Sequence, residues 1–248
     1  MSERNILITG ASSGIGNSVA DELVKAGTNK LTFVARNLEK LNSSLNNILP
    51  ANADKYKAVI ADLTDDVQLK KVIEAVNEPL DAVVLAAGEL KYKPATLVNR
   101  AGLTEMFNIN FFAPVLLIQG LLKAKKIQKG GSIVFISSVS AKVGVPATLE
   151  YASSKAALES SVRVLAAELA VKKIKVNSVC PGLVNTPMLE KASRDINIDI
   201  ATSNSANYPL GIGEPKDVAE LILFLISDKN NWITGQNIVI DGGYLLNR

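Results

Sequence analysis

The sequence of 248 residues contains no histidine and only one cysteine, Cys180. Without histidine, neither a Ser-His-Asp nor a Cys-His nucleophilic mechanism can operate, and the usual histidine-ligated zinc site cannot form. A single cysteine allows neither an internal disulfide nor a cysteine cluster for a metal ion. We therefore expect no metal site, and an enzyme built from this chain must take its acid and base from Tyr, Lys, Asp or Glu.

Long apolar runs and a strong excess of charge are missing as well. The longest uninterrupted apolar run, Phe111–Ile118, contains a proline and falls far short of the roughly 18 residues of a membrane span. Near the N-terminus only Ile6–Ile8 precede a polar loop, which is too short for the apolar region of a signal peptide. The net charge of +3 is too small to indicate nucleic-acid binding. We expect a cytoplasmic protein with no membrane and no nucleic-acid partner.

One basic cluster, Lys123–Lys129, lies just before Gly130 and Gly131. Lysines offset the dipole at the end of a helix, and a glycine closes the last turn. We interpret the cluster as such a helix end; the alternative is a phosphate-binding patch.

Short apolar runs alternate with longer helical patterns along the whole chain. Hydrophobic residues make up 48% and charged residues 21%, which is enough apolar material for a buried core. The expected strands are Asn5–Thr9, Leu31–Ala35, Lys57–Ala61, Asp81–Ala86, Ser132–Ser137, Ile174–Val179 and Asn237–Ile240. The expected helices are one with Ile15, Val19 and Leu23 on a single face, then Leu38–Leu49, Asp65–Val76, Asn99–Leu122, Tyr151–Val171 and Pro215–Ser227.

The composition of the strands indicates how they pack. Most are nearly continuous in Val, Ile, Leu and Ala, as expected for strands covered on both faces. Alternation of such strands with helices predicts an α/β fold, a Rossmann-type doubly wound parallel sheet of about seven strands with helices on both faces. We expect residues 1–248 to form one dinucleotide-binding and catalytic domain. The segment Pro187–Pro209 has weak periodicity and is rich in Asn, Ser and Asp, which predicts an irregular lid over the substrate.

A glycine-rich turn follows the first expected strand directly. Glycine lets the chain turn sharply and approach a phosphate closely, and the helix that follows points its free N–H groups at the anion. The position between a strand and a helix at the start of the fold favours a dinucleotide site over a plain turn. The residues expected to contact the cofactor are Gly10, Ser12, Ser13, Gly14, Ile15 and Gly16.

The ends of the second and third strands bear on the adenosine half of the cofactor. NAD-binding proteins usually place an acid after the second strand, whereas an arginine favours a 2′-phosphate. Here Arg36 and Asn37 stand there and Leu31–Asn37 contains no acid, which predicts NADP(H). Asp62, followed by Leu63, either reaches the adenine or caps the next helix, a role for which Thr64 and Asp65 compete.

Tyr151 and Lys155 are four residues apart on an expected helix, so both side chains project from one face. A free tyrosine has a pKa of about 10, and a nearby lysine cation lowers it towards the neutral range. In a chain without histidine, this pair is the most credible acid–base pair. Ser138 lies at the end of the fifth expected strand, where ligands bind in sheets of this class.

With these motifs in order, the chain resembles the short-chain dehydrogenase/reductases, in the compact branch of carbonyl reductases and 3-oxoacyl-carrier-protein reductases. The resemblance covers nearly the whole chain. It continues beyond the residues above with Gly88, Asn110, Pro181-Gly182, Val184, Thr186, Ile233–Gln236 and Asp241–Gly243.

The resemblance implies roles for these residues. Tyr151 would protonate the carbonyl oxygen, Ser138 would hydrogen-bond it, and Lys155 would hold the nicotinamide ribose and lower the Tyr151 pKa. Asn110 would hold a water that links Lys155 to solvent. Gly88 and the segment Pro181–Thr186 would contact the cofactor, with Val184 and Thr186 at the nicotinamide carboxamide and Asp62 and Leu63 at the adenine.

Two positions depart from the family pattern. Ala86 stands where an asparagine is usual, so a polar tie to the neighbouring backbone is lost. Ser13 stands where some NADP-binding members have an arginine, so the 2′-phosphate would depend mainly on Arg36.

Three functions are consistent with this sequence. The first is an NADP(H)-dependent reductase of a ketone or aldehyde, acting on a small-molecule carbonyl or alcohol substrate in either direction. The second is a 3-oxoacyl-carrier-protein reductase, which would need a basic docking surface. The third is a regulatory protein that binds NADP(H) without catalysis. Relatives often pack the segment corresponding to Trp232–Leu246 across subunits, which implies a homodimer or homotetramer.

Overall fold

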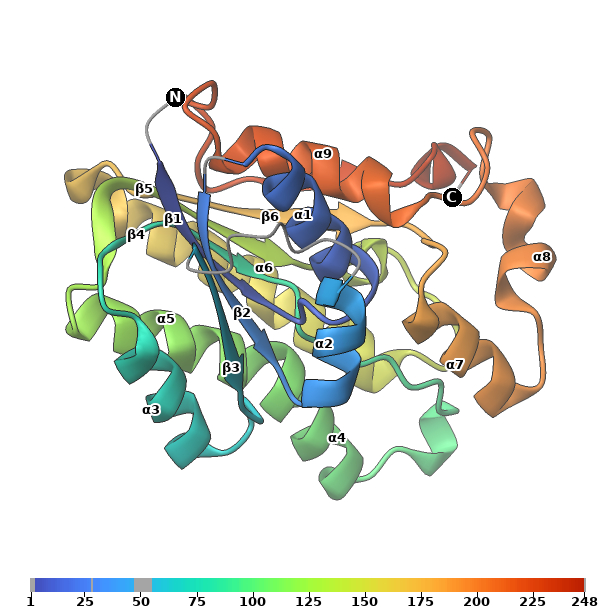
Figure 1. Ribbon diagram of the computed structural model, residues 1–248. Coiled ribbons are helices and arrows are strands. Elements are labelled where there is room, and N and C mark those ends of the chain that lie inside the picture. Colours follow the sequence, from blue (N-terminus) through green and yellow to red (C-terminus); the bar gives the residue numbers. More distant parts are fainter. Residues whose placement is uncertain (1–2, 28, 47–54, 248) are drawn as a thin grey trace.

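The computed structural model describes residues 3–27, 29–46 and 55–247 (Figure 1). Its centre is a seven-stranded sheet, parallel throughout, in the order β3-β2-β1-β4-β5-β6-β7. The strands are β1 (Arg4–Thr9), β2 (Asn29–Ala35), β3 (Tyr56–Ile60), β4 (Leu80–Leu85), β5 (Ile127–Ile136), β6 (Lys175–Pro181) and β7 (Asn237–Ile240). All seven expected strands and the predicted fold class are confirmed.

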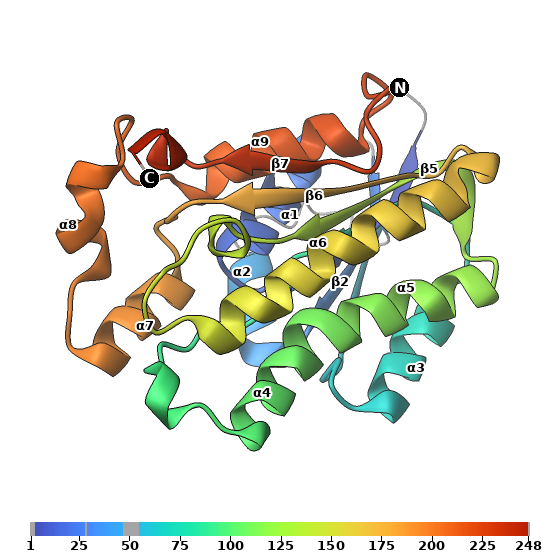
Figure 2. The ribbon, with the colours of Figure 1, turned by 180° about the vertical axis from the view of Figure 1, so that it is seen from behind.

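Helices cover both faces of this sheet, as Figures 1 and 2 show from opposite sides. The α-helices are α1 (Gly14–Lys25), α2 (Leu38–Asn46), α3 (Asp66–Ala75), α4 (Arg100–Phe107), α5 (Ala113–Lys123), α6 (Leu149–Leu169), α7 (Pro187–Ile196), α8 (Ile200–Asn204) and α9 (Pro215–Ile226). The last residues of the helix expected over Leu38–Leu49 lie outside the described residues.

The alternation of side chains along each strand divides the core into two layers. From β1, Ile6 and Ile8 pack in a cluster with residues of α1 and α9, whereas Leu7 packs on the other face with residues of α3, α5 and α6. Because both faces of the central strands are covered, their carboxyl-terminal parts are mostly apolar and buried, which is why their positions could be predicted; the edge strands β3 and β7 are partly exposed.

The expected helix Asn99–Leu122 is divided into three parts. A π-helix, Asn108–Phe112, joins α4 to α5, and it carries Asn110. The continuous run Arg100–Lys123 contains an 18-residue window with a mean hydropathy of 1.4, so it is long and apolar enough to cross a membrane by length and composition alone. A core helix gives the same values, and this run packs against α3 and α6.

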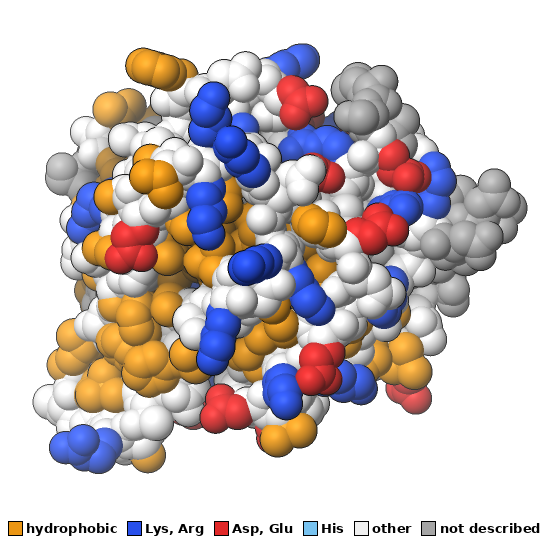
Figure 3. Space-filling model, turned by 90° about the vertical axis from the view of Figure 1, so that its left-hand side faces the viewer, with side chains coloured by type: hydrophobic (Ala, Val, Ile, Leu, Met, Phe, Trp, Pro, Cys, Tyr) orange, Lys and Arg blue, Asp and Glu red, His pale blue; other side chains and the backbone are white. Residues whose placement is uncertain are grey.

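The basic cluster differs in detail from its prediction. Helix α5 ends at Lys123, and Lys125 rather than a glycine adopts the left-handed conformation, with φ 56°. The Lys126 ammonium donates to the carbonyls of Ile73 and Val76, 2.8 and 2.7 Å away, at the end of α3. Figure 3, which views the left-hand side of Figure 1, shows many basic side chains set among apolar and acidic ones.

The irregular conformation predicted for Pro187–Pro209 is wrong, whereas the role of this segment as a lid stays a prediction. The segment forms α7 and α8, and each helix begins with a side-chain cap: Thr186 accepts from the Leu189 N–H, and Asp199 accepts from the Thr202 N–H. Asp199 is thus one of the polar residues that weakened the apolar periodicity of this segment.

Candidate functional site

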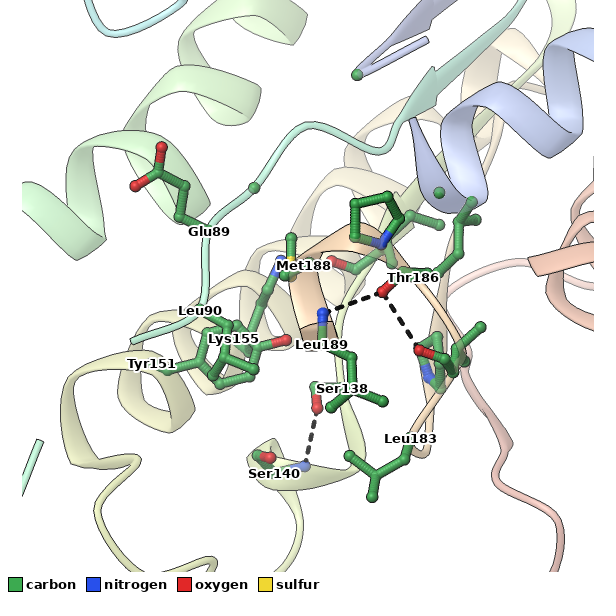
Figure 4. A pocket seen from close by; sticks show the side chains of 18 of the residues that line it. Glu89, Leu90, Ser138, Ser140, Tyr151, Lys155, Leu183, Thr186, Met188 and Leu189 are labelled. Atoms are coloured by element: carbon green, nitrogen blue, oxygen red, sulfur yellow. Dashed lines mark hydrogen bonds between the residues drawn. The ribbon is translucent and has the colours of Figure 1, made fainter. Parts of the chain in front are cut away.

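A cavity of about 830 Å³ opens at the carboxyl ends of the strands. The strand order reverses between β1 and β4, and ligands of open α/β sheets bind at such a point. The turn after β1, the ends of β2, β4, β5 and β6, and the helices α7 and α8 all line the cavity. Figure 4 shows Ser138, Tyr151 and Lys155 within it, with Thr186, Met188 and Leu189 nearby.

The turn after β1 needs its glycines for steric reasons. A Cβ on Gly10, whose φ is +68°, would lie 2.8 Å from the backbone nitrogen of Ala87. A Cβ on Gly16 would lie 2.5 Å from the carbonyl oxygen of Gly10. In the described part of the chain, Ser13 makes no side-chain capping bond to the start of α1. Gly14 and Ile15, the first residues of α1, line the cavity, which is the position that an anion-binding helix start requires.

The part of the cavity at the end of β2, where the adenosine was expected, holds an ion pair that the sequence did not reveal. A nitrogen of the Arg36 guanidinium lies 2.8 Å from a Glu89 carboxylate oxygen. Asp62 does not line the cavity; its side chain accepts hydrogen bonds from the backbone and hydroxyl of Thr64, and these hold the Asp62 pKa below its usual value. Asp65 is the cap of α3, since its carboxylate accepts from the Gln68 N–H.

Burial dominates the electrostatics of Tyr151 and Lys155. It raises the pKa of Tyr151 to about 12, and a hydrogen bond with Ser138 opposes the rise. It lowers the pKa of Lys155 to about 8. The Lys155 ammonium donates to the carbonyl of Ile136 at 2.8 Å and lies 5.8 Å from the centre of the Tyr151 ring. The lowered Tyr151 pKa expected from the four-residue spacing is therefore not found here, because desolvation is the larger effect.

Asn110 acts on the backbone that follows β4. Its Oδ1 accepts from the Glu89 N–H at 3.0 Å, and its amide donates to the Glu89 carbonyl at 2.9 Å and to the Ser154 hydroxyl at 3.2 Å. A Cβ on Gly88 would meet Asn110 Oδ1 at 2.9 Å and Lys155 Nζ at 3.4 Å, so these two side chains converge on that glycine.

Thr9 supplies a tie beside Ala86, where the usual asparagine is absent. The Ala87 N–H donates to the buried Thr9 hydroxyl at 3.1 Å. Together, Thr9 and Asn110 fix the segment after β4 from two sides.

Most of the predicted site residues meet in the one cavity. Those that line it are Gly10, Ser12, Ser13, Gly14, Ile15, Arg36, Asn37, Leu63, Gly88, Ser138, Tyr151, Lys155, Pro181, Gly182, Val184 and Thr186. Gly16, Asp62 and Asn110 are not among the lining residues. Gly16 and Asn110 instead support residues that are.

The substrate end, the part of the cavity beyond Ser138 and Tyr151, was predicted only as segments: the sequence indicated Val139–Glu150 and Pro187–Pro209 but no individual residues, and it did not indicate Leu90, Tyr92 or Leu183. This end is lined by Leu90, Tyr92, Val145, Leu183, Met188, Leu189, Ile198 and Tyr208. The Tyr208 hydroxyl accepts from the Leu183 N–H at 3.0 Å, and its ring stacks on Tyr244 with centroids 4.8 Å apart. These residues come from three separate segments, so no local motif could identify them. For Glu89, the available signal was its place directly after Gly88.

The fold and this cavity define a nucleotide-binding α/β protein with a buried Ser-Tyr-Lys group beside the nucleotide turn. A family model described as enoyl-(acyl carrier protein) reductase matches residues 10–245. The chain belongs to the short-chain dehydrogenase/reductase family, whose members are oxidoreductases that bind a nicotinamide cofactor.

Individual relatives agree over nearly their full length. An uncharacterized oxidoreductase, YmfI, of Bacillus subtilis is 33% identical over 245 residues, covering 97% of this chain and 98% of the relative. The 3-oxoacyl-[acyl-carrier-protein] reductase FabG of Thermotoga maritima is 35% identical over 248 residues, with 97% of each covered. Among solved structures, ElxO with NADP bound has a TM-score of 0.86 and 31% identity, covering 99% of this chain and 100% of that one.

Proposed function

We propose that this protein is an NADP(H)-dependent oxidoreductase that reduces the carbonyl of a ketone or aldehyde to an alcohol, reversibly. The observation that carries the proposal is the convergence of Ser138, Tyr151 and Lys155 in the cavity that also contains the glycine turn. Two hydroxyls and a cation at one point provide a proton donor and hydrogen bonds for a developing oxyanion.

The residues of the cavity fit a dinucleotide. A Cβ on Gly10 or Gly16 would collide with the neighbouring backbone, so glycine lets the turn pack this closely, and the start of α1, which has no side-chain cap from Ser13, lines the cavity. We propose that the residues Gly10–Gly16 hold the pyrophosphate, Leu63 lies at the adenine, and the segment Pro181–Thr186 contacts the nicotinamide. The cofactor, when bound, supplies the hydride.

The protein's own residues supply the proton. With its pKa near 12, Tyr151 is protonated at neutral pH, which is the state that a proton donor needs. Ser138, which is hydrogen-bonded to Tyr151, would donate a hydrogen bond to the same carbonyl oxygen of the substrate and help to orient it. Lys155 would hold the nicotinamide ribose, and Asn110 would keep the adjacent backbone in place.

Arg36 supports NADP(H) over NAD(H), as does the NADP bound in the similar structure of ElxO. To bind a 2′-phosphate, the Arg36 guanidinium has to turn at least partly from Glu89. Arg36→Asp is expected to shift the ratio of kcat/KM values from NADPH towards NADH, because the arginine–phosphate attraction becomes repulsion. Steady-state kinetics with both cofactors measure the shift, and an unchanged ratio would contradict the role of Arg36.

The substrate end favours an uncharged carbonyl compound. The residues named above for this end have apolar or tyrosine side chains; Ser140, Ser203 and Asn204 add uncharged polar groups to the lining, and the Glu89 carboxylate beside Leu90 is paired with Arg36. The alternative, reduction of 3-oxoacyl groups on a carrier protein, is supported by the names of several relatives. An acidic carrier would need a basic rim, yet Pro187–Pro209 contains two basic and three acidic residues. That segment is also the one we propose to cover the substrate.

The test follows NADPH and NADH consumption with ketones, diketones, aldehydes and acetoacetyl thioesters, for the purified protein and for Tyr151→Phe. We expect the wild type alone to consume cofactor, and Tyr151→Phe to bind NADPH normally while losing most of its kcat, since only the proton donor is removed. Equal turnover by both proteins would refute the role of Tyr151. NADPH binding without turnover on any carbonyl would indicate the regulatory function.

We further propose a cytoplasmic homodimer or homotetramer. Trp232 is 96% exposed and Leu246 is 83% exposed in the single chain, and large apolar side chains in such positions are typical of interfaces. Light scattering would give the oligomeric state.

A further inference from the structure

A buried carboxylate lies directly behind the catalytic group, outside the cavity. Tyr151, Lys155 and Glu159 are spaced by four residues along α6 and therefore share one face of that helix. Glu159 is only 7% exposed, and it does not line the cavity. Burial of a charged carboxylate is costly unless it is paired and fully hydrogen-bonded.

Three donors converge on the Glu159 carboxylate. One oxygen accepts from the Ser137 hydroxyl at 2.9 Å and from the Cys180 thiol at 3.0 Å, and the other lies 3.1 Å from the Lys142 ammonium. Burial, together with the hydrogen bond to Glu159, raises the pKa of Cys180 to about 12, so this thiol keeps its proton and can donate. The carboxylate is thus anchored from β6 as well as from the segment after β5.

The two other donors lie on either side of Ser138 in the sequence. Ser137 precedes it directly, and Lys142 follows the 3₁₀ turn Val139–Ala141 that Ser138 itself caps, since the Ser138 hydroxyl oxygen accepts from the Ser140 N–H at 3.1 Å. Glu159 therefore holds both ends of the short segment 137–142. Any displacement of this segment moves the Ser138 hydroxyl relative to Tyr151, which is fixed on the same helix as Glu159.

We propose that Glu159 is a positioning residue. It binds Ser137 and Lys142 at the two ends of the segment 137–142 and so fixes the Ser138 hydroxyl opposite Tyr151. The consequence for turnover rests on the proposed function. A misplacement of about 1 Å in a catalytic group lowers the rate by up to a hundredfold. Loss of the Glu159 contacts should therefore lower kcat as well as loosen the segment 137–142.

Two substitutions disrupt the contact between Glu159 and Lys142, one from each residue. Glu159→Gln keeps the shape and an acceptor oxygen for Ser137 but turns an amide towards the Lys142 ammonium. Lys142→Met keeps the length of the side chain and removes the ammonium. Lys142→Arg retains charge and donors and is the conservative rescue. Lys126→Met is the matched control, because Lys126 also donates to neighbouring groups of the fold but lies at the amino end of β5, whereas the cavity opens at the carboxyl ends of the strands.

Two measurements test the proposal, each at a temperature well below the Tm of every variant. Hydrogen–deuterium exchange of the cofactor-free protein reports on the amides of residues 140–143, which bond within the turn. Kinetics with the best carbonyl substrate report kcat. For Glu159→Gln and Lys142→Met we expect about tenfold faster exchange there and a kcat lowered roughly tenfold to a hundredfold. The Kd for NADPH is expected to change less than about twofold. Lys142→Arg and Lys126→Met should match the wild type in both measurements.

Unchanged exchange in residues 140–143, or unchanged kcat despite a lower Tm, would overturn the proposal and leave Glu159 with a purely structural part. If the wild type reduces no carbonyl, the proposed function fails instead. The exchange measurement then still decides whether Glu159 holds the segment that carries Ser138.

Discussion

Lys155→Met should make the protein more stable while it removes activity. Lys155 is buried, and burial lowers its pKa from 10.5 to about 8. The buried Lys155 charge at neutral pH therefore lowers the stability of the folded protein. The proposed function requires this charge, whereas folding does not. Methionine has nearly the same length and volume, so the substitution removes the charge and leaves little empty space.

The size of the effect follows from two opposing terms. The lowered pKa corresponds to a penalty of about 3 kcal/mol for the charged form. Loss of the hydrogen bond to the Ile136 carbonyl destabilises the variant by about 1–2 kcal/mol. The net stabilisation at pH 7 is then about 1–2 kcal/mol, or a rise in Tm of about 2–8 °C for a chain of this size.

The gain must also depend on pH in one direction. Below pH 8 the buried lysine is charged in the folded wild type, so the penalty is fully present. Between pH 8 and 10.5 the folded wild type releases this proton while the unfolded chain keeps it, so wild-type stability rises relative to the variant. The advantage of Lys155→Met is lost as the pH passes through this range. Tyr151 is present in both proteins and cancels in the comparison.

Urea unfolding of both proteins at pH 7 and pH 10 measures the difference. Lys126→Met serves as the control and should be less stable than the wild type at both values, because its ammonium stabilises the end of α3. A Lys155→Met protein that is less stable than the wild type at pH 7, or an advantage that persists unchanged at pH 10, would refute the reasoning.

Two further predictions concern the turn after β1. Gly16→Ala should lower stability by about 1–3 kcal/mol and weaken NADPH binding, because the new Cβ meets the Gly10 carbonyl at 2.5 Å. Calorimetric titration measures the binding, and Gly144→Ala, which meets no described atom within 4 Å, should have no effect. Thr9→Val should cost about 1–3 kcal/mol in urea unfolding, because the Ala87 N–H loses its acceptor. Unaltered stability would show that this N–H finds another partner.

Local patterns were sufficient for the sheet and for the nucleotide turn. Strands such as β4 and β6 are buried on both faces, so their apolar runs stand out from the helices around them. Gly10 and Gly16 were predictable because their need for glycine is steric and local. The π-helix at Asn110 was not predicted, since the apolar residues continue across Asn108–Phe112 and the sequence analysis placed a single helix over the whole run.

Contacts between distant segments could not be predicted. Arg36 and Glu89 lie 53 positions apart in the sequence, and their ion pair depends on β2 and β4 flanking β1. The same applies to Glu159, which meets Ser137, Lys142 and Cys180 only once α6 lies on the sheet. From sequence alone, a single acidic residue on a helix is expected to be exposed to solvent.

The sign of the Tyr151 pKa shift also depended on tertiary structure, and it bears on the direction of the reaction. Spacing alone brings Lys155 beside Tyr151 and predicts a lowered pKa, but it gives no measure of desolvation. Burial favours the neutral form of both groups: it raises the pKa of Tyr151 to about 12 and lowers the pKa of Lys155 to about 8. A neutral tyrosine is ready to give a proton, whereas alcohol oxidation would need it to accept one. For the reductase that we propose, a protonated Tyr151 favours carbonyl reduction, and the reverse reaction should gain relative rate as the pH rises.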